Sequence, residues 1–404
     1  MSRGLGDVYK RQAEAVAARI GYPLLVRPSY VLGGRGMMIA YDAERLREYM
    51  AEATKVSPDH PIYLDRFLEG AYESDVDALC DGEEVYIGGI LEHIEEAGIH
   101  SGDSATCIPP FSFSDALVAK LRETTRKIAM ALGVRGLVNV QYAIKGDAIY
   151  VIEANPRASR TVPFISKATG VPLARAAACI MSGKKISELN LPSDERTLDW
   201  FCMKEAVMPW GRFPGAEVVL GPEMKSTGEV MGIAKSYPEA YAKTQMAIDY
   251  ELPTPADGKV FISVCDRDKR HILSIARILT HLGFTVCSTE GTARVLRGGN
   301  VSCEVVGKIS GAHDGELPNI GDMIANGEIA LIINTPYGPG SRGDGYHLRA
   351  EAIRRGVTCV TALAAANAYV SALEARQEDK AAGAEGADGM AVVALQDLPQ
   401  YVIE

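Results

Sequence analysis

The hydrophobic pattern of the first 250 residues predicts short strands alternating with amphipathic helices. Apolar runs rich in β-branched and aromatic residues favour strands, whereas apolar positions three and four apart favour helices. On these grounds strands are expected at residues 22–28, 37–41, 61–68, 73–80, 84–91, 134–144, 148–152 and 200–207. Helices are expected at 13–20, 42–55, 114–132 and 236–246, with a helix-rich stretch over 160–183. The strands at 61–68, 73–80 and 84–91 are predicted to be antiparallel strands of one mixed sheet.

From residue 259 the pattern changes to regular strand–helix alternation. Strands are expected at 259–264, 283–287, 301–306, 329–334 and 357–361, with helices at 268–282, after 292, at 346–355 and at 362–373. This spacing predicts a doubly wound parallel sheet that binds ligands at the carboxyl ends of its strands.

Composition along the sequence suggests where the domains divide. The Pro/Gly-rich segment 251–258 is the predicted linker between a unit at 13–250 and a second unit at 259–376. Residues 1–12 have no clear period, so we expect a foreign or disordered start. The tail 377–404 opens with an Ala/Gly/Glu/Asp-rich stretch and is expected to be partly disordered.

Overall composition restricts the class of protein. The 404 residues are 47% hydrophobic and 23% charged with a net charge of -10, which argues against a general nucleic-acid or anionic-membrane binder. No apolar run approaches the roughly 20 residues of a membrane span, and no secretory signal is seen. The eight cysteines form no C-x-x-C pair, which is typical of reduced thiols in a cytoplasmic protein, and their spacing supports no zinc site.

The strand at 148–152 ends in a row of polar residues. Residues two apart share a face of an extended strand, so Glu153, Asn155 and Arg157 are predicted to point the same way. Two oxygen ligands and a guanidinium suit a hard cation that holds a polyphosphate. A turn at 145–147 brings Gln141 onto the neighbouring antiparallel strand, where it can share the ion. A polar strand edge without function is the alternative.

Other polar segments also allow two interpretations. Arg27 and the glycine loop 31–36 suit phosphate binding, or the loop is a flexible turn. Alternating acids at 73–77 usually form a solvated strand face, although Glu73 could reach a ribose hydroxyl. The polar loop 92–104 carries His100, which is either functional or a satisfied loop histidine. In the second unit, hydroxyls, lysine and an amide at strand ends suit a phosphorylated small molecule, or are ordinary loop polarity: Thr289, Thr292, Lys308 and Asn334.

The ordered set of these motifs resembles the carbamoyl phosphate synthetase large subunit. The motifs are Val26–Gly34, Ile94–Ser104, Gly136–Gln141, Ile152–Arg157, Pro163–Pro172 and Leu220–Val230. The match is to the second, C-terminal ATP-grasp unit, which is followed by an allosteric domain similar to methylglyoxal synthase, and it covers roughly residues 13–375. The implied fold is α/β and α+β: a partial ATP-grasp unit of mixed antiparallel sheets, then a doubly wound parallel domain.

The resemblance implies roles for individual residues. Arg27 would contact the nucleotide phosphate, and Gly33 and Gly34 would lie in the mobile flap over it. Arg66 and Leu68 would form the adenine hinge, and Glu73 would hold the ribose. The nucleotide and phosphoryl site would be lined by Gly98, Ile99, His100 and Ser101. Magnesium would be held by Gln141, Glu153 and Asn155, with Arg157 facing the phosphoryl group, so that Arg157, His100 and Asn155 are the catalytic candidates.

Allosteric roles are implied in the same way. An acidic pocket that binds ornithine in some members matches Glu95, Asp103 and Glu205. A nucleotide monophosphate site matches Lys269, Thr289, Thr292, Lys308 and Asn334. Pro336 stands where some members have threonine, which leaves the identity of the effector open.

The implied activity is ATP- and Mg²⁺- or Mn²⁺-dependent phosphorylation of carbamate to carbamoyl phosphate, for pyrimidine and arginine biosynthesis. The family enzyme is a carbon–nitrogen ligase of the glutamine-hydrolysing type, whose glutaminase small subunit docks mainly elsewhere. The first synthetic unit, the oligomerisation domain and the front subdomain of the second unit have no counterpart in these 404 residues, so we expect an N-terminally truncated fragment that is incomplete for the full reaction. The alternatives are another ATP-grasp ligase or carboxylase, or a non-catalytic nucleotide-sensing fragment.

Overall fold

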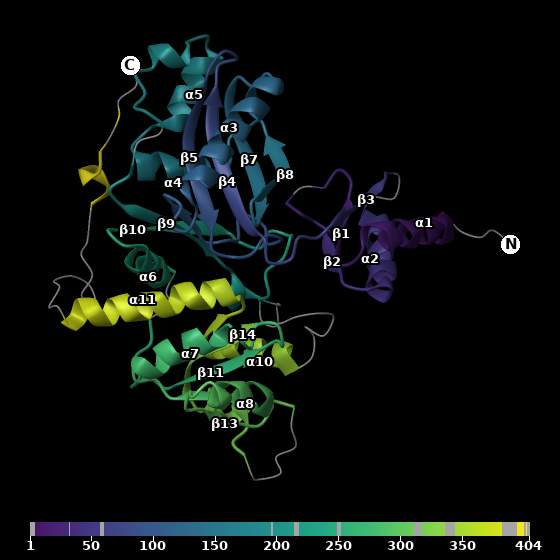
Figure 1. Cartoon of the computed structure of the whole chain (residues 1–404), viewed down its shortest axis with the longest axis vertical. Coiled ribbons are helices and arrows are strands. Elements are labelled where there is room, and N and C mark those ends of the chain that lie inside the picture. Colours follow the sequence, from purple (N-terminus) through teal and green to yellow (C-terminus); the bar gives the residue numbers. More distant parts are fainter. Residues whose placement is uncertain are drawn as a thin grey trace.

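Three sheets organise the protein (Figure 1). The computed structural model describes residues 5–31, 33–56, 60–194, 197–213, 218–248, 252–310, 317–335, 344–381, 394–399 and 401. A three-stranded and a seven-stranded antiparallel sheet come first, and a five-stranded parallel sheet follows. The predicted fold class, antiparallel α+β followed by parallel α/β, is therefore confirmed.

The first sheet forms a small lobe with two helices. Its strands β1 (Leu24–Pro28), β2 (Met38–Ala40) and β3 (Ile62–Arg66) lie in the order β2-β1-β3. Helices α1 (Leu5–Ile20) and α2 (Ala43–Val56) bury Leu24, Val26 and Leu46 against it. Two expectations are corrected here: α1 begins at Leu5 rather than at residue 13, and β3 pairs with β1 instead of joining the larger sheet.

The seven-stranded sheet carries the core of the first unit in the order β10-β9-β6-β5-β4-β7-β8. The strands are β4 (Tyr72–Cys80), β5 (Val85–His93), β6 (Thr106–Ile108), β7 (Gly136–Lys145), β8 (Ala148–Asn155), β9 (Phe201–Val207) and β10 (Gly228–Ala234). Helix α3 (Asp115–Ala131) contributes Leu121 and Ala129 to one apolar cluster, and it begins at Ser114, whose hydroxyl accepts the N–H of Leu117. A second cluster is built from α4 (Thr161–Thr169), α5 (Leu173–Met181), the short helix η1 (Ile186–Glu188) and β9.

The two strands that the sequence did not predict are β6 and β10. The segment around β10 reads as a glycine-punctuated loop, yet it forms the edge of the sheet beside β9. Gly232 explains the difference, because a Cβ there would lie 2.2 Å from the carbonyl oxygen of Ala240 in α6 (Tyr237–Ala247). The glycine therefore serves close helix–strand packing rather than a turn.

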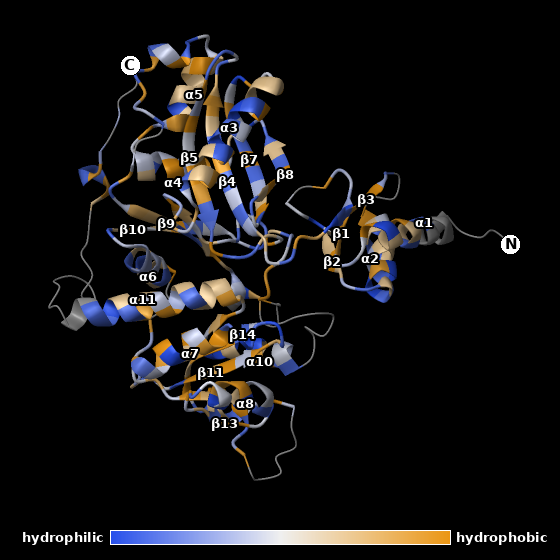
Figure 2. Cartoon of the chain, viewed as in Figure 1, coloured by the Kyte–Doolittle hydropathy of each residue, from blue (hydrophilic) through white to orange (hydrophobic). Residues whose placement is uncertain are grey.

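The parallel sheet has the order β13-β12-β11-β14-β15. Its strands are β11 (Lys259–Val264), β12 (Val286–Ser288), β13 (Glu304–Val305), β14 (Ile329–Thr335) and β15 (Thr358–Val360). The helices are α7 (Ile272–His281), α8 (Glu290–Gly298), α9 (Ile320–Ala325), α10 (Asp344–Arg355) and α11 (Leu363–Ala381). Figure 2 shows the largely hydrophobic central strands beneath these helices, as a sheet covered on both faces requires. Helix α9 was not predicted.

Helix α11 joins the two units. It continues to Ala381, beyond the predicted end at 373, and packs against both α6 and α7 (Figure 1). One apolar cluster therefore runs from Met203 and Tyr241 in the first unit to Tyr369 and Ile275 in the second. In the tail, a short helix η4 (Leu395–Asp397) precedes the buried Leu398, and the N–H of Tyr401 donates to the carbonyl of Gly170 at 2.9 Å.

None of the helices in the described part of the protein is both long and apolar enough to cross a membrane.

Candidate active site

The hairpin of β7 and β8 places the candidate metal ligands. Gln141 is directly opposite Glu153 and Asn139 is opposite Asn155, with a bulge immediately after Gln141. Strand β8 is the edge of its sheet, and its end is accessible from solvent. The hairpin thus brings an amide and a carboxylate onto adjacent strands, as the sequence predicts.

A series of hydrogen bonds holds the three polar residues of the strand end together. Asn155 Nδ2 donates to Glu153 Oε1 at 2.8 Å, and Arg157 Nη2 donates to Asn155 Oδ1 at 3.3 Å. The predicted common face of these side chains is therefore observed. The carboxylate of Glu153 and the amide oxygens of Gln141 and Asn155 are ligands that suit a hard divalent cation such as Mg²⁺. They do not suit zinc, and no group of three His, Cys, Asp or Glu side chains with metal-binding geometry occurs among the described residues.

The polar loop 94–104 lies against this hairpin. Gln141 Nε2 donates a hydrogen bond to Ser101 Oγ at 2.7 Å. The N–H of His100 donates to the carbonyl of Gly221 at 2.8 Å, and this second bond also fixes the loop. His100 Nδ1 accepts the N–H of Gly102 at 3.0 Å, so a neutral imidazole presents Nε2–H as a donor. Burial lowers the pKa of His100, and the charges of Asp103 and Glu153 partly offset this effect. His100 therefore offers the site a neutral donor.

Gly98 fixes the other end of this loop against the predicted hinge. Its φ is +108°, and a Cβ there would lie 2.4 Å from Phe67 Cε2, so only glycine fits. The N–H of Ala97 donates to the carbonyl of Ala71 at 2.8 Å, and Ile99 forms an isolated bridge with Ala97. Leu68 is half-buried beside Ala71, whereas Arg66 is exposed. The loop and the hinge thus form one continuous surface.

Glu73 lies buried beneath the loop. Burial is the main reason that the pKa of Glu73 is raised to about 7; Asp75 and Glu153 add to the rise, whereas His93 and the N–H of Gly98 oppose it. The interpretation of the acids at 73–77 as a solvated face was wrong, because Glu73, Asp75 and Asp77 are all buried. Helix α4 and the loop 94–104 cover that side of the sheet, and both come from later in the sequence.

These buried acids have partners that the sequence did not single out. Asp75 Oδ2 is 3.3 Å from His93 Nε2, and Asp77 Oδ1 accepts the hydroxyl of Ser159 at 2.6 Å. Burial raises the pKa of Asp77 to about 6. The buried Lys204 donates from Nζ to the carbonyl of Ser101 at 3.2 Å, and burial lowers its pKa. A polar layer therefore supports the loop from below, and only strand order, which single-sequence patterns do not give, could have revealed it.

The glycine loop of the small lobe meets a second loop, at residues 218–226. The N–H of Met224 donates to the carbonyl of Gly33 at 3.0 Å, and Gly34 has φ +69°. A Cβ on Gly34 would lie 1.8 Å from the carbonyl oxygen of Pro222. The same second loop accepts the N–H of His100 through Gly221. It therefore connects the predicted flap to the predicted phosphoryl site.

Arg27 is already paired within the small lobe. Its Nη2 lies 2.9 Å from Asp65 Oδ2, and its guanidinium stands over the Tyr63 ring. The structure therefore shows Arg27 bound to strand β3 rather than to the hairpin that carries Glu153. Asp65 is a partner that the sequence analysis missed.

Two of the three predicted effector acids come together at the boundary between the units. Glu95 and Glu205 are buried, and burial first, then the charge of Glu95, raises the pKa of Glu205 to about 8. Burial likewise raises the pKa of Glu95 to about 7. Asp103 is separately engaged, because its two oxygens accept the N–H groups of Lys225 and Ser226 at 2.7 and 2.8 Å.

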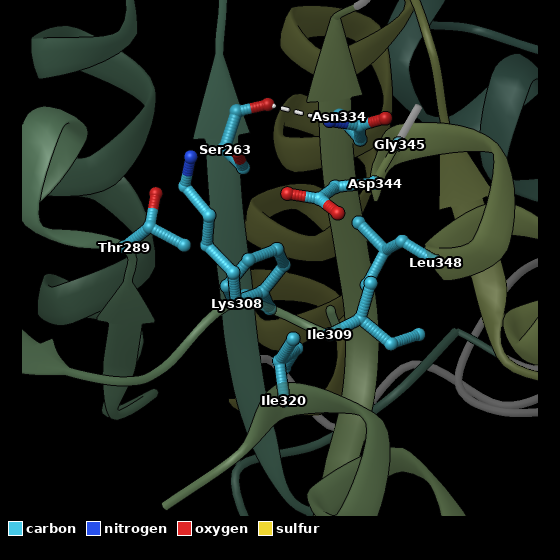
Figure 3. A pocket seen from close by; sticks show the side chains of 10 residues that line it. Ser263, Thr289, Lys308, Ile309, Ile320, Asn334, Asp344, Gly345 and Leu348 are labelled. Carbon is cyan, nitrogen blue, oxygen red and sulfur yellow. Dashed lines mark hydrogen bonds between the residues drawn. The ribbon is translucent and has the colours of Figure 1, made fainter. Parts of the chain in front are cut away.

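The parallel domain contains a pocket of about 170 Å³ between the ends of β11 and β14. Figure 3 shows the side chains of Thr289, Lys308 and Asp344 around it. Asn334 also lines it, but its amide already donates to the carbonyl of Ser263 at 2.9 Å and accepts from Arg349 at 2.8 Å. Asp344 was not predicted.

The remaining predicted effector residues lie close to this pocket. Thr289 precedes the first turn of α8, and Thr292 is buried within that turn. Lys269 Nζ would lie 3.6 Å from a Cβ built on Gly291, and it pairs with Asp266 at 2.5 Å. The predicted effector residues thus lie at the carboxyl ends of neighbouring strands, at one edge of the parallel sheet. Pro336, whose replacement of threonine left the effector open, lies outside the described residues.

Comparison with known proteins gives matches over most of the sequence. Residues 6–189 match the family model "Carbamoyl-phosphate synthase L chain, ATP binding domain", and residues 271–361 match the MGS-like domain. The carbamoyl phosphate synthase large chain of Methanothermobacter thermautotrophicus is 54% identical over 366 residues, which is 90% of this protein and 34% of the relative. A separate C-terminal section of the large chain, from Methanocaldococcus jannaschii, is 51% identical over 380 residues, covering 92% of this protein and 61% of the relative.

A solved structure, the biotin carboxylase domain of Hydrogenobacter thermophilus 2-oxoglutarate carboxylase, is 18% identical, covers 60% of each protein and has a TM-score of 0.48, which carries no functional argument.

Fold and matches together define an ATP-binding unit of the ATP-grasp type followed by an MGS-like domain. Over about 90% of its length the sequence is similar to carbamoyl phosphate synthase large chains, one of which is a separate C-terminal section of that chain. It spans about a third of the length of the full-length relative given above and 61% of the separate C-terminal section.

Proposed function

We propose that this protein holds the site that phosphorylates carbamate with ATP to give carbamoyl phosphate. The observation that supports this proposal most directly is the geometry at the end of the β7–β8 hairpin. There Gln141 faces Glu153, and Glu153 accepts a hydrogen bond from Asn155. The family match supports an ATP-dependent ligase, and the donor set supports Mg²⁺ or Mn²⁺ as the metal. The activity would serve the synthesis of pyrimidines and arginine.

In the proposed reaction a carbamate oxygen attacks the γ-phosphorus of ATP. A new P–O bond forms while the bond between the γ-phosphorus and the β–γ bridging oxygen breaks, and ADP leaves with the electron pair. Gln141, Glu153 and Asn155 would hold the metal, which when bound neutralises phosphate charge. Phosphoryl transfer depends mainly on positioning and charge stabilisation, so a protein nucleophile is not required.

The side chains of the site would do the positioning. Arg157 is bonded to Asn155 and can place its remaining N–H groups toward the transferring phosphoryl oxygens. His100 would donate from Nε2–H, in keeping with its lowered pKa. The flap glycines Gly33 and Gly34 lie against loop 218–226 and would cover the phosphates. Glu73, Arg66, Leu68, Gly98 and Ile99 would contact the nucleoside, and Arg27 would reach phosphate only by leaving Asp65.

The decisive experiment runs the transfer backwards. ATP formation from ADP and carbamoyl phosphate, measured by luciferase luminescence, is expected with Mg²⁺ present. Acetyl phosphate in its place should give none. ATP from acetyl phosphate as well would favour another ATP-grasp ligase or carboxylase. MgATP binding without any ATP formation would favour a non-catalytic nucleotide-sensing fragment.

A regulatory function is proposed for the second unit on the strength of its pocket. Lys308 and Thr289 suit the phosphate of a nucleoside monophosphate, and the carboxylate of Asp344 suits hydroxyl donors such as those of ribose. The buried pair Glu95 and Glu205 suits a cationic amino acid such as ornithine, because an ammonium group would relieve the repulsion between the carboxylates. In the whole enzyme, the glutaminase subunit is a further proposed partner.

A further inference from the structure

Arg267 connects the two units through a group of carboxylates. It lies in the turn that follows β11, in the parallel domain. Its Nη1 is 3.7 Å from Glu69 Oε1, its Nη2 is 3.5 Å from Glu96 Oε2, and its Nε is 3.3 Å from Asp268 Oδ1. Glu69 and Glu96 belong to the ATP-binding unit, so one guanidinium spans the boundary.

Two of these carboxylates belong to the ATP-binding unit, one next to the predicted hinge and the other within the nucleotide loop 94–104. Glu69 immediately follows the predicted hinge residue Leu68, and Glu96 precedes Gly98 in the loop that carries His100. The bond from Ala97 N–H to the carbonyl of Ala71 fastens the loop to the hinge between them. Glu69 Oε1 is buried and makes no hydrogen bond among the described residues, so the charge of Arg267 compensates it. A change at Arg267 therefore acts on both walls of the predicted adenine and phosphate site.

In the second unit, Arg267 belongs to the turn that carries Lys269, a predicted effector residue. The N–H of Asp268 donates to the carbonyl of Cys265 at 3.1 Å and that of His271 donates to the carbonyl of Asp268 at 3.0 Å, so the turn is tightly hydrogen-bonded. Lys269, two residues after Arg267, pairs with Asp266 and approaches the first turn of α8. The effector lysine and the interdomain arginine are therefore parts of one small rigid segment.

We propose that Arg267 is a positioning residue, which holds the nucleotide loop 94–104 from the second unit and transmits the state of the effector turn to the ATP site. The part that concerns ATP rests on the proposed function. Stability alone is a poor explanation for the contact, because the Arg267 side chain is 43% exposed and ion pairs this exposed add little to folding. The same weak contacts suffice to bias a loop, since small couplings change affinity several-fold.

The first test measures loop mobility without any ligand. Hydrogen exchange of the amides at 96–104 is expected to be about two- to fivefold faster in Arg267→Ala than in the parent protein, because the loop loses its attachment to the second unit. Arg267→Lys should restore most of the protection, since lysine keeps one charged contact. The matched control is Arg294→Ala, whose ion pair with Glu290 lies within α8. Unchanged exchange at 96–104, or faster exchange spread evenly over the second unit, would overturn the proposal.

The second test measures MgATP affinity by calorimetry on the same variants of the 404-residue protein. Arg267→Ala is expected to raise the Kd about two- to fivefold, and adding Glu96→Gln should increase it no further, because both changes remove one contact. Fully additive effects, or an unchanged Kd in Arg267→Ala, would refute the role at the ATP site. A parent protein that binds no MgATP would refute the proposed function instead, and loop exchange would still decide whether Arg267 holds the loop.

Discussion

Gln141 and Glu153 face each other across the β7–β8 hairpin, and both are tied to other residues of the site. Gln141 donates to Ser101 Oγ at 2.7 Å, while Glu153 accepts from Asn155 at 2.8 Å. The amide thus fixes the loop 94–104, and the carboxylate fixes the strand end. Because Glu153 provides the negative charge among the three predicted metal ligands, it is the residue whose change tests the site most directly.

Replacing Glu153 with glutamine should weaken MgATP binding about tenfold or more, because the cation loses its charged ligand while the side-chain shape is kept. Isothermal titration with MgATP measures the effect. Glu123→Gln is the control, since Glu123 pairs with Lys127 on the exposed surface of α3. Equal affinities in the parent and Glu153→Gln would refute the metal assignment.

Gly34→Ala should separate the flap from loop 218–226. The added Cβ would lie 1.8 Å from the carbonyl oxygen of Pro222, and the φ of +69° also disfavours alanine. We expect about fivefold weaker MgATP binding, equivalent to about 1 kcal/mol. Gly146→Ala is the matched control, because Gly146 has φ +57° but a Cβ there meets no atom within 4 Å. Equal effects in the two variants would mean that backbone strain alone, and not flap contact, is responsible.

The hairpin was predictable from sequence because its signals are local. A turn at 145–147 and the two-residue period place Gln141, Glu153 and Asn155 without knowledge of the rest of the fold. Helix α3 was predictable in the same way, from its apolar spacing over 114–132. Gly33 and Gly34 were correctly predicted to lie in a loop between two strands, and the structure shows that these strands pair antiparallel.

The buried polar layer was not predictable, because its environment is made by distant segments. Asp77 is buried by Ser159 and Thr161, more than eighty residues later, so its strand reads as half-solvated until the cover is known. Strand β10 was missed because Gly232 resembles a loop residue, although it is required by the approach of α6. Arg267 has no local pattern at all, since its partners Glu69 and Glu96 come from another unit.

Lys308→Met should weaken the binding of nucleoside monophosphates to the second unit at least about tenfold. The ammonium group is the cation that lines the described part of the pocket, and loss of a charge-assisted bond to phosphate costs about 1.5–3 kcal/mol, or at least about tenfold in Kd. Calorimetric titration of the 404-residue protein with uridine or inosine monophosphate measures the loss. Arg294→Ala on α8 should bind as the parent does. Unaltered binding in Lys308→Met would place the effector elsewhere.

Glu205→Gln should make the protein more stable at pH 8. The pKa of Glu205 is raised to about 8 and that of Glu95 to about 7, so between about pH 4.5 and 8 the folded state holds more protons than the unfolded state. The free energy of unfolding therefore falls as pH rises through this window, and the fall ends above the folded-state pKa values.

The neutral glutamine keeps an oxygen for the side chain of Gln245 but removes the penalty of a buried charge. Its advantage over the parent should be absent near pH 4.5 and exceed about 1 kcal/mol at pH 8, the free energy of one pKa unit. Urea unfolding at pH 5, 6.5 and 8 measures this difference, and the exposed Glu84→Gln should show no such trend. An advantage that stays constant with pH would show that packing, and not the charge of Glu205, is responsible.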